Sequence, residues 1–233
     1  MMNKNKIDPN CENCSTIADC FKNLSKEELD KITENKVHLK YGKKEIVAKQ
    51  GSFSSHIIFI RQGYLKLYIE SDFENKDLII NVFGPNQLIG LSSLFESNTY
   101  QYSIAALVPA ELCLFEVADI KKMINQNSEF ALGILRRSHK STIHAYNQMY
   151  NLTHKQLNGR IASAFLYLSR HIFDSPVFEM ILSRNELANF TAMSTMSAVR
   201  TIKELEKQGV IVDNRGMIEI KDFEALEKIS RFG

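Results

Sequence analysis

Between residues 37 and 118 the chain consists of short apolar runs that glycines separate. The runs read EIVA, HIIFI, YLKLYI, LIINVF and ELCLFEV, and glycines occur at positions 42, 51, 63, 84 and 90. Short runs rich in β-branched and aromatic residues, at close spacing, are typical of antiparallel strands, and glycine supplies the positive φ that tight turns need. This segment therefore predicts an antiparallel β-roll or barrel.

Helical patterns flank this segment on both sides. Residues 24–34 predict a short amphipathic helix with Ser25 as its N-cap and Glu28 as the capping-box partner. Residues 119–157 contain no proline and one glycine, and Asn127 or Ser128 can cap a second, longer helix within them. At ~1.5 Å per residue this helix is roughly 40 Å long, which one small domain cannot bury.

Heptad spacing along the long helix predicts a seam at which a second copy of the chain packs closely. The seam residues are small or apolar: Leu135, Ser138, Thr142, Ala145, Met149 and Leu152. A helix that lies on its own barrel stays open as the alternative, because the seam is mixed in polarity.

The last 76 residues predict a winged helix-turn-helix. A helix over 160–172 ends before Pro176, and a second helix runs from Arg184 to Phe190. A turn around Ala192 and Met193 leads to a third helix from Thr195 to Gln208, which Gly209 stops before the hairpin VIV-DNRG-MIEI. Helix, short turn, helix and a two-stranded wing is the order of that DNA-binding motif.

The third helix predicts a DNA-reading face. Its buried stripe consists of Ala198, Ile202 and Leu205, so we expect the opposite face to enter the major groove. There Arg200 can make bidentate hydrogen bonds to guanine. The candidate DNA-contacting residues are Ser183, Arg184, Ser194, Thr195, Met196, Ser197, Val199, Arg200, Lys203 and Arg215. The net charge of the whole chain is only +2, but residues 183–203 hold a local excess of positive charge. A helical hairpin for protein contact remains the alternative.

Three of the four cysteines, Cys11, Cys14 and Cys20, lie within ten residues, and the fourth is Cys113. The chain has no apolar run of 18 residues and no signal-peptide pattern, so we expect a cytoplasmic protein without a membrane partner. Thiols stay reduced there, which favours metal ligation or redox chemistry over disulfides. The six histidines are scattered and no strand precedes Cys11, so we do not expect an enzyme.

The chain from Cys11 to about Leu226 resembles the CRP/FNR family of bacterial transcription regulators. The resemblance lies in YGKKEIVAKQGSFSSHIIFIRQGYLKLY, the long helix, RIASAFLYLSR and the helix-turn-helix. It implies an α+β fold with a jelly-roll-like β-roll of cyclic-nucleotide-binding type, a dimerisation helix and a winged helix-turn-helix. The implied segments are a cysteine-bearing arm (1–21), the roll (22–126), the dimer helix (127–157) and the DNA-binding domain (158–233).

Within that family the chain is most similar to the FNR branch, whose C-x2-C-x5-C spacing and distant fourth cysteine hold a [4Fe–4S] cluster. The resemblance implies that Cys11, Cys14, Cys20 and Cys113 are the ligands and that oxygen or nitric oxide is the signal. It also implies a homodimer on near-palindromic double-stranded DNA and contact with RNA polymerase. Zinc, or no metal, is the alternative at the thiolates, and then haem or a small effector in the roll would be the signal.

Two departures from the family pattern bear on function. Family members that bind cyclic nucleotides use a glutamate for the ribose and an arginine for the phosphate, where this chain has Leu91 and Tyr102. A cyclic phosphate would lack its charge partner, so cyclic AMP is a weaker alternative. FNR-type proteins read DNA with Glu-x-x-Ser-Arg, and this chain keeps only the arginine, with Met196 and Val199 at the other two positions. We therefore expect an altered half-site.

Overall fold

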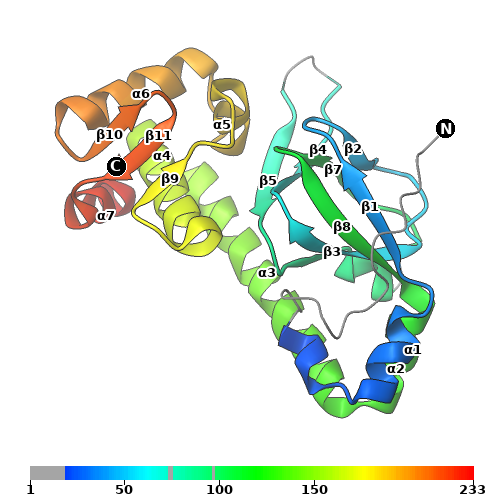
Figure 1. Cartoon of the computed structure of the whole chain (residues 1–233). Helices are drawn as coiled ribbons and strands as arrows, with labels where there is room; N and C mark the ends of the chain where they lie inside the picture. Colours follow the sequence, from blue (N-terminus) through cyan, green and yellow to red (C-terminus); the bar gives the residue numbers. More distant parts are fainter. Residues whose placement is uncertain (1–18, 73–75, 96–97) are drawn as a thin grey trace. The chain divides into compact units, whose positions relative to one another are not determined.

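The structure is a computed structural model that describes residues 19–72, 76–95 and 98–233 (Figure 1). The chain divides into two compact units, Met1–Leu67 with Phe83–Ile143 and Tyr68–Val82 with His144–Gly233. Among the described residues, no helix has both the length and the apolar character that crossing a bilayer requires.

Two four-stranded antiparallel sheets form the predicted β-roll, which is confirmed. The strand order is β1-β8-β3-β6 in one sheet and β2-β7-β4-β5 in the other. The strands are β1 (Val37–Tyr41), β2 (Ile46–Ala48), β3 (His56–Gln62), β4 (Leu65–Ile69), β5 (Leu78–Phe83), β6 (Leu88–Ile89), β7 (Ser103–Ala106) and β8 (Ala110–Glu116), with a 3-10 turn η3 (Leu91–Leu94) after β6. One turn requires glycine: Gly63 has φ +89°, and a Cβ there would lie 2.5 Å from the Pro109 carbonyl oxygen.

Strand β8 is central in the first sheet, and its register places two residues beside Cys113. His38 of β1 and Phe59 of β3 both stand opposite Cys113. Directly opposed residues of an antiparallel pair point to the same face, with Cβ atoms about 4.5–5.5 Å apart. The face of β8 that carries Cys113 and Phe115 is therefore also the face of His38 and Phe59.

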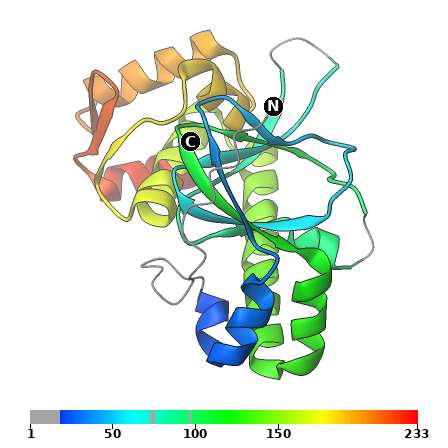
Figure 2. The same ribbon diagram turned by 45° about the vertical axis from the view of Figure 1, so that its right-hand side comes forward.

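Short helices cover this face of the first sheet. They are η2 (Asp19–Asn23), α1 (Lys26–Thr33) and α2 (Val117–Gln126), and Figure 2 shows α1 and α2 beside the start of α3 (Ser128–His154). One buried apolar cluster joins them to the sheet through Phe21, Ile32, Met123 and Phe130 together with Phe115. The Ser25 capping box of α1 is confirmed, because the Ser25 hydroxyl accepts from the Glu28 N–H and the Glu28 carboxylate accepts from the Ser25 N–H.

The long helix α3 begins where the sequence predicts and ends earlier. The Asn127 side-chain oxygen accepts a 2.9 Å hydrogen bond from the Phe130 N–H, so Asn127 supplies the cap. The helix stops at His154, not at residue 157, because Gln156 has extended backbone angles and is the N-cap of the next helix, α4 (Leu157–Tyr167).

The C-terminal part has the predicted helix-turn-helix and wing. Helix α5 (Arg184–Phe190) has the expected bounds, and helix α6 (Thr195–Lys207) ends one residue before the expected Gln208. Strand β10 (Ile211–Asn214) pairs with β11 (Met217–Ile220). The predicted helix over 160–172 is present as α4, which starts three residues earlier, and continues as a π-helical turn η4 (Leu168–Phe173). Two elements were not predicted: a third wing strand β9 (Val177–Glu179) paired with β11, and a final helix α7 (Phe223–Phe232).

Candidate nucleic-acid interface and cysteine site

Helix α6 is fixed to its domain by the stripe that the sequence predicts. Ala198, Ile202 and Leu205 are almost fully buried, and Thr201 joins them. The Ser194 hydroxyl accepts a 3.1 Å hydrogen bond from the Ser197 N–H and caps the helix. The turn before it reverses at Ala192, which has φ +48°. The opposite face of α6 is thereby held outward.

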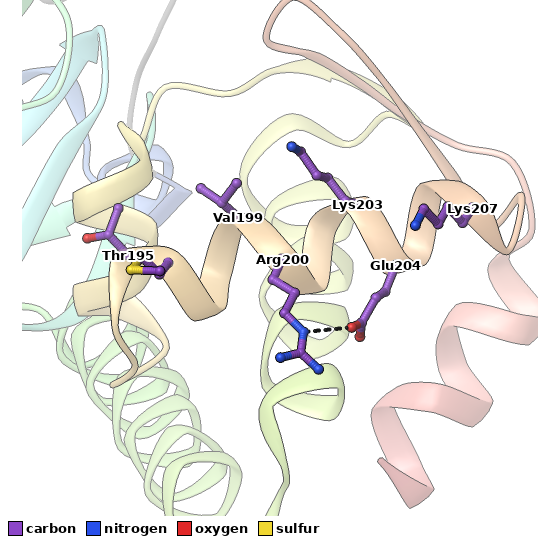
Figure 3. A pocket seen from close by; sticks show the side chains of 7 residues that line it. Thr195, Val199, Arg200, Lys203, Glu204 and Lys207 are labelled. Atoms are coloured by element: carbon purple, nitrogen blue, oxygen red, sulfur yellow. Dashed lines mark hydrogen bonds and ion pairs between the residues drawn. The ribbon is translucent and has the colours of Figure 1, made fainter.

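The outward face of α6 forms a surface hollow (Figure 3). Its lining residues are Thr195, Met196, Val199, Arg200, Lys203, Glu204 and Lys207. Met196 is 85 % exposed although it is large and apolar, and exposed apolar side chains of this kind suit contact with thymine methyls. The structure thus brings together five of the predicted contact residues. Glu204 and Lys207 were not among the predicted contact residues, although the 3.6-residue period places both on this face.

Arg200 is exposed and pairs with an acid on its own helix. Its Nε donates a 3.0 Å hydrogen bond to Glu204 Oε1, four residues further on (Figure 3). Exposed pairs of this type contribute only ~0.3–0.5 kcal/mol, so DNA can compete for the guanidinium. The pair holds Arg200 along the helix face rather than fixing it in a buried site.

The structure places Arg184 differently from the free contact residue that the sequence suggests. Its guanidinium is paired with the Asp213 carboxylate on the wing strand β10. Its Nη1 is buried without a hydrogen-bond partner among the described residues. Arg184 thus joins α5 to the wing, while Ser183 caps α5 in a capping box with Glu186. Arg215 is exposed at the tip of the wing turn, with φ +53°.

The predicted dimer seam lies on a face of α3 that is largely exposed in the single chain. Leu135, Thr142, Ala145 and Met149 are exposed, and Ser138 and Leu152 are half-buried. Further large apolar side chains on α3 are also exposed, and sequence reasoning did not include them: Leu132, Ile143, Tyr146 and Tyr150. This apolar stripe is larger than the six predicted residues and is the kind of surface that a partner helix covers.

The described residues contain one side chain of the predicted cysteine set. Cys113 is 5 % exposed on β8. Cys11 and Cys14 lie outside the described residues, and Cys20 falls in η2 with its side chain outside what is described. Within the described part of the chain no group of three His, Cys, Asp or Glu residues could hold a metal ion. Three of the four predicted cysteine ligands lie outside that part or have no described side chain.

The packing next to Cys20 fits a shared site with Cys113. Phe21 follows Cys20 in the chain, and its ring lies 5.1 Å from the Phe115 ring and 5.6 Å from the Phe130 ring, centroid to centroid. Phe115 is two residues after Cys113 and therefore on the same face of β8. Phe21 and Cys113 belong to one buried cluster. The backbone of the third cysteine is thus fastened to the face of the sheet that carries the fourth.

His38 lies on the same face and lacks a hydrogen bond. Its side chain is 7 % exposed, and among the described residues neither ring nitrogen has a hydrogen-bond partner. Glu111 Oε2 is 3.6 Å from His38 Nε2, which is beyond hydrogen-bond reach, and Glu111 Oε1 pairs with Lys40 at 2.8 Å. Burial lowers the pKa of His38, and the nearby Glu111 carboxylate opposes that effect.

The positions that bind cyclic nucleotides in relatives of this fold hold uncharged side chains here. Leu91 is buried in η3. The Tyr102 hydroxyl lies 3.4 Å from the Ser92 hydroxyl, and burial raises the pKa of Tyr102, so it stays neutral. A neutral phenol cannot replace the positive charge that a cyclic phosphate needs.

The fold and this interface define a DNA-binding transcription regulator with a β-roll joined to a winged helix-turn-helix. The family model "Cyclic nucleotide-binding domain" matches residues 38–127, and the model "Crp-like helix-turn-helix domain" matches residues 159–229. Together the two matches span more than half of the chain, which belongs to the CRP/FNR family of transcription regulators.

Relatives and solved structures agree with this family. The chain is 24 % identical to "Transcriptional activator protein anr" of Pseudomonas aeruginosa, over 91 % of this chain and 88 % of that protein. It is 24 % identical to "Anaerobic regulatory protein" of Haemophilus influenzae, over 94 % of this chain and 87 % of that protein. FixK2 of Bradyrhizobium japonicum has a similar fold, with a TM-score of 0.76 at 16 % identity over 83 % of this chain and 96 % of that one.

Proposed function

We propose that this regulator responds to oxygen or nitric oxide through a [4Fe–4S] cluster held by Cys11, Cys14, Cys20 and Cys113. When bound, such a cluster supplies an iron–sulfur centre that both gases attack. Four soft thiolates are the ligand set that it needs. Binding of the cluster would favour the packing in which the dimer helix α3 can pair with a second copy. The paired form would then bind the operator.

One observation carries this proposal: Phe21 packs against Phe115 and Phe130 within the cluster that contains Cys113. Phe130 lies in the first turn of α3. A ligand that binds Cys20 and Cys113 together would hold Phe21 in this position, and its loss would free the segment. The coupling is then between two states, with and without the cluster. The cluster-bound state favours the packing in which α3 can pair with α3 of a second copy.

The names of relatives support the same signal. A protein of Haemophilus influenzae and one of Pasteurella multocida are both called "Anaerobic regulatory protein". An oxygen-responsive switch in this chain would suit a role of that kind, and its four cysteines are the ligands that such a switch would use. A relative of Thermus thermophilus is called "Cyclic AMP receptor protein", but Leu91 and Tyr102 argue against that ligand here.

We further propose that the active form is a homodimer paired along the apolar stripe of α3. Two α6 helices related by a twofold axis would enter successive major grooves about one turn (~34 Å) apart, which requires a near-palindromic operator. RNA polymerase is the expected further partner of the DNA-bound dimer.

Metal and sulfide analysis tests the proposed cofactor. We expect protein purified without oxygen to be coloured, with about four iron and four sulfide per chain, as a [4Fe–4S] cluster requires. A colourless protein with one zinc per chain would overturn the gas-sensing proposal and leave a redox-silent site. Protein that contains neither iron nor zinc would also overturn the gas-sensing proposal and would favour an effector that binds in the β-roll.

Two substitutions on α6 test the DNA-reading role. We expect Arg200→Ala to weaken binding to a specific operator by ~1–3 kcal/mol and to relax the preference at one base pair, because a bidentate base contact is lost. Lys203→Ala should weaken all sequences about equally and lower the salt slope by about one, because it removes a phosphate contact. Titration of specific and random duplexes at several salt concentrations separates the two. Equal loss on both duplexes for Arg200→Ala would refute the base-reading role.

A further inference from the structure

His38 is a buried histidine whose hydrogen-bonding groups have no partner among the described residues. Its side chain is 7 % exposed, and both Nδ1 and Nε2 are buried without a hydrogen bond there. A buried polar group that lacks a hydrogen bond destabilises the folded state, so such groups are uncommon and call for an explanation. A ligand bound beside the ring would supply the missing partner.

The strand register shows where such a partner would lie. His38 stands directly opposite Cys113 across the β1–β8 pairing, and both side chains point to one face of the sheet. On the other side of Cys113, the opposed residue is the apolar Phe59. Of the two cross-strand neighbours of Cys113, His38 is therefore the one with a hydrogen-bond donor, although neither ring nitrogen is bonded to the Cys113 sulfur in this structure.

Three of the charged residues near His38 interact with each other. Glu111 Oε1 pairs with Lys40 Nζ at 2.8 Å, and Glu111 Oε2 lies 3.9 Å from Arg61 Nη1. The same Oε2 lies 3.6 Å from His38 Nε2, which is too far for a hydrogen bond. Glu111 therefore does not hydrogen-bond the ring, and both ring nitrogens lack a partner in the described part of the chain.

We infer that His38 donates an imidazole N–H hydrogen bond to the Cys113 thiolate when the four cysteines hold the [4Fe–4S] cluster, an inference that rests on the proposed function. A thiolate sulfur in a cluster carries negative charge and accepts hydrogen bonds from nearby donors. Hydrogen bonds to cluster sulfurs help to set the reduction potential and stability of the cluster. His38 is then a positioning residue that stabilises the cluster, while the four cysteines supply all the ligands.

Iron release to a chelator tests this role without using DNA binding. We expect His38→Leu and His38→Phe, which lack the donor but differ in shape, to lose iron to a ferrous chelator ~10–100-fold faster than the wild-type protein, the usual range for losing such a supporting contact. His38→Gln keeps an N–H donor and should restore most of the stability. Circular dichroism melts show whether each variant is folded.

His56→Leu is the matched control. His56 lies on β3 of the same sheet and stands opposite Glu116, three residues after Cys113, so alternation places it on the other face. Its iron release should equal that of the wild-type protein. Unchanged release in His38→Leu and His38→Phe would overturn the inference alone, and failure of glutamine to rescue would overturn the donor role. Wild-type protein without iron and sulfide would overturn the proposed function itself, and the inference with it.

Discussion

Cys113→Ser is expected to abolish the proposed cluster and with it the oxygen response of operator binding. Serine replaces a thiolate by a neutral hydroxyl, which is a poor ligand for iron, and three cysteines remain where four are needed. We expect anaerobically purified Cys113→Ser to hold less than one iron per chain and to bind the operator equally before and after air. Iron and sulfide assays together with operator titration measure both effects.

A second variant separates ligand loss from misfolding. Cys113 is buried in an apolar cluster, so a serine hydroxyl there can also destabilise the sheet. Cys113→Ala removes the thiolate but keeps the site apolar, and it should lose the cluster while its melting curve stays near that of wild-type protein stripped of its cluster. Retention of four iron atoms and of the oxygen response in both variants would exclude Cys113 as a ligand.

Phe130→Ala is expected to destabilise the first unit by ~3–5 kcal/mol, the usual cost of removing a buried phenylalanine side chain. Phe130 is fully buried, and it stacks on Phe21, which follows Cys20. The substitution leaves a cavity where the Phe130 ring packs against Phe21 of η2. Urea unfolding followed by circular dichroism measures the loss.

Leu132→Ala provides the control for this substitution. Leu132 is two residues further along α3 but 43 % exposed, so its truncation in the single chain should cost less than ~1 kcal/mol. Measurements at low protein concentration limit any effect of pairing. Equal destabilisation by the two variants would contradict the assignment of Phe130 to the core that anchors η2.

The sequence was sufficient to predict the elements whose signals are local. Helix α5 begins and ends where its cap and period indicate, and the buried stripe of α6 follows from spacing alone. Strand β9 has only three residues and pairs with β11 far along the chain, so it carries no local signal. The sequence of the π-helical turn after Tyr167 reads as an ordinary helix, so it carries no local signal for the wider turn.

The parts of the candidate sites that depend on local periodicity could also be predicted, and the parts that depend on distant residues could not. The face of α6 could be read from periodicity, but the partner of Arg184 could not, because Asp213 lies 29 residues away on a wing strand. His38 was not singled out, since only the register of β1 against β8 brings it opposite Cys113. Tyr146 and Tyr150 were missed on α3 because a strict heptad is narrower than the exposed apolar stripe.

Operator binding by one anaerobic preparation, measured before and after exposure to air, tests the central claim most directly. The probe is a duplex selected from a random pool by the anaerobic protein, and an unselected duplex is the control. We predict that air weakens binding to the selected duplex by roughly 5–150-fold, the usual range for coupling between two sites, as iron is lost. Binding to the unselected duplex should change little. Unchanged operator affinity after complete loss of iron would contradict the claim that the cluster governs DNA binding.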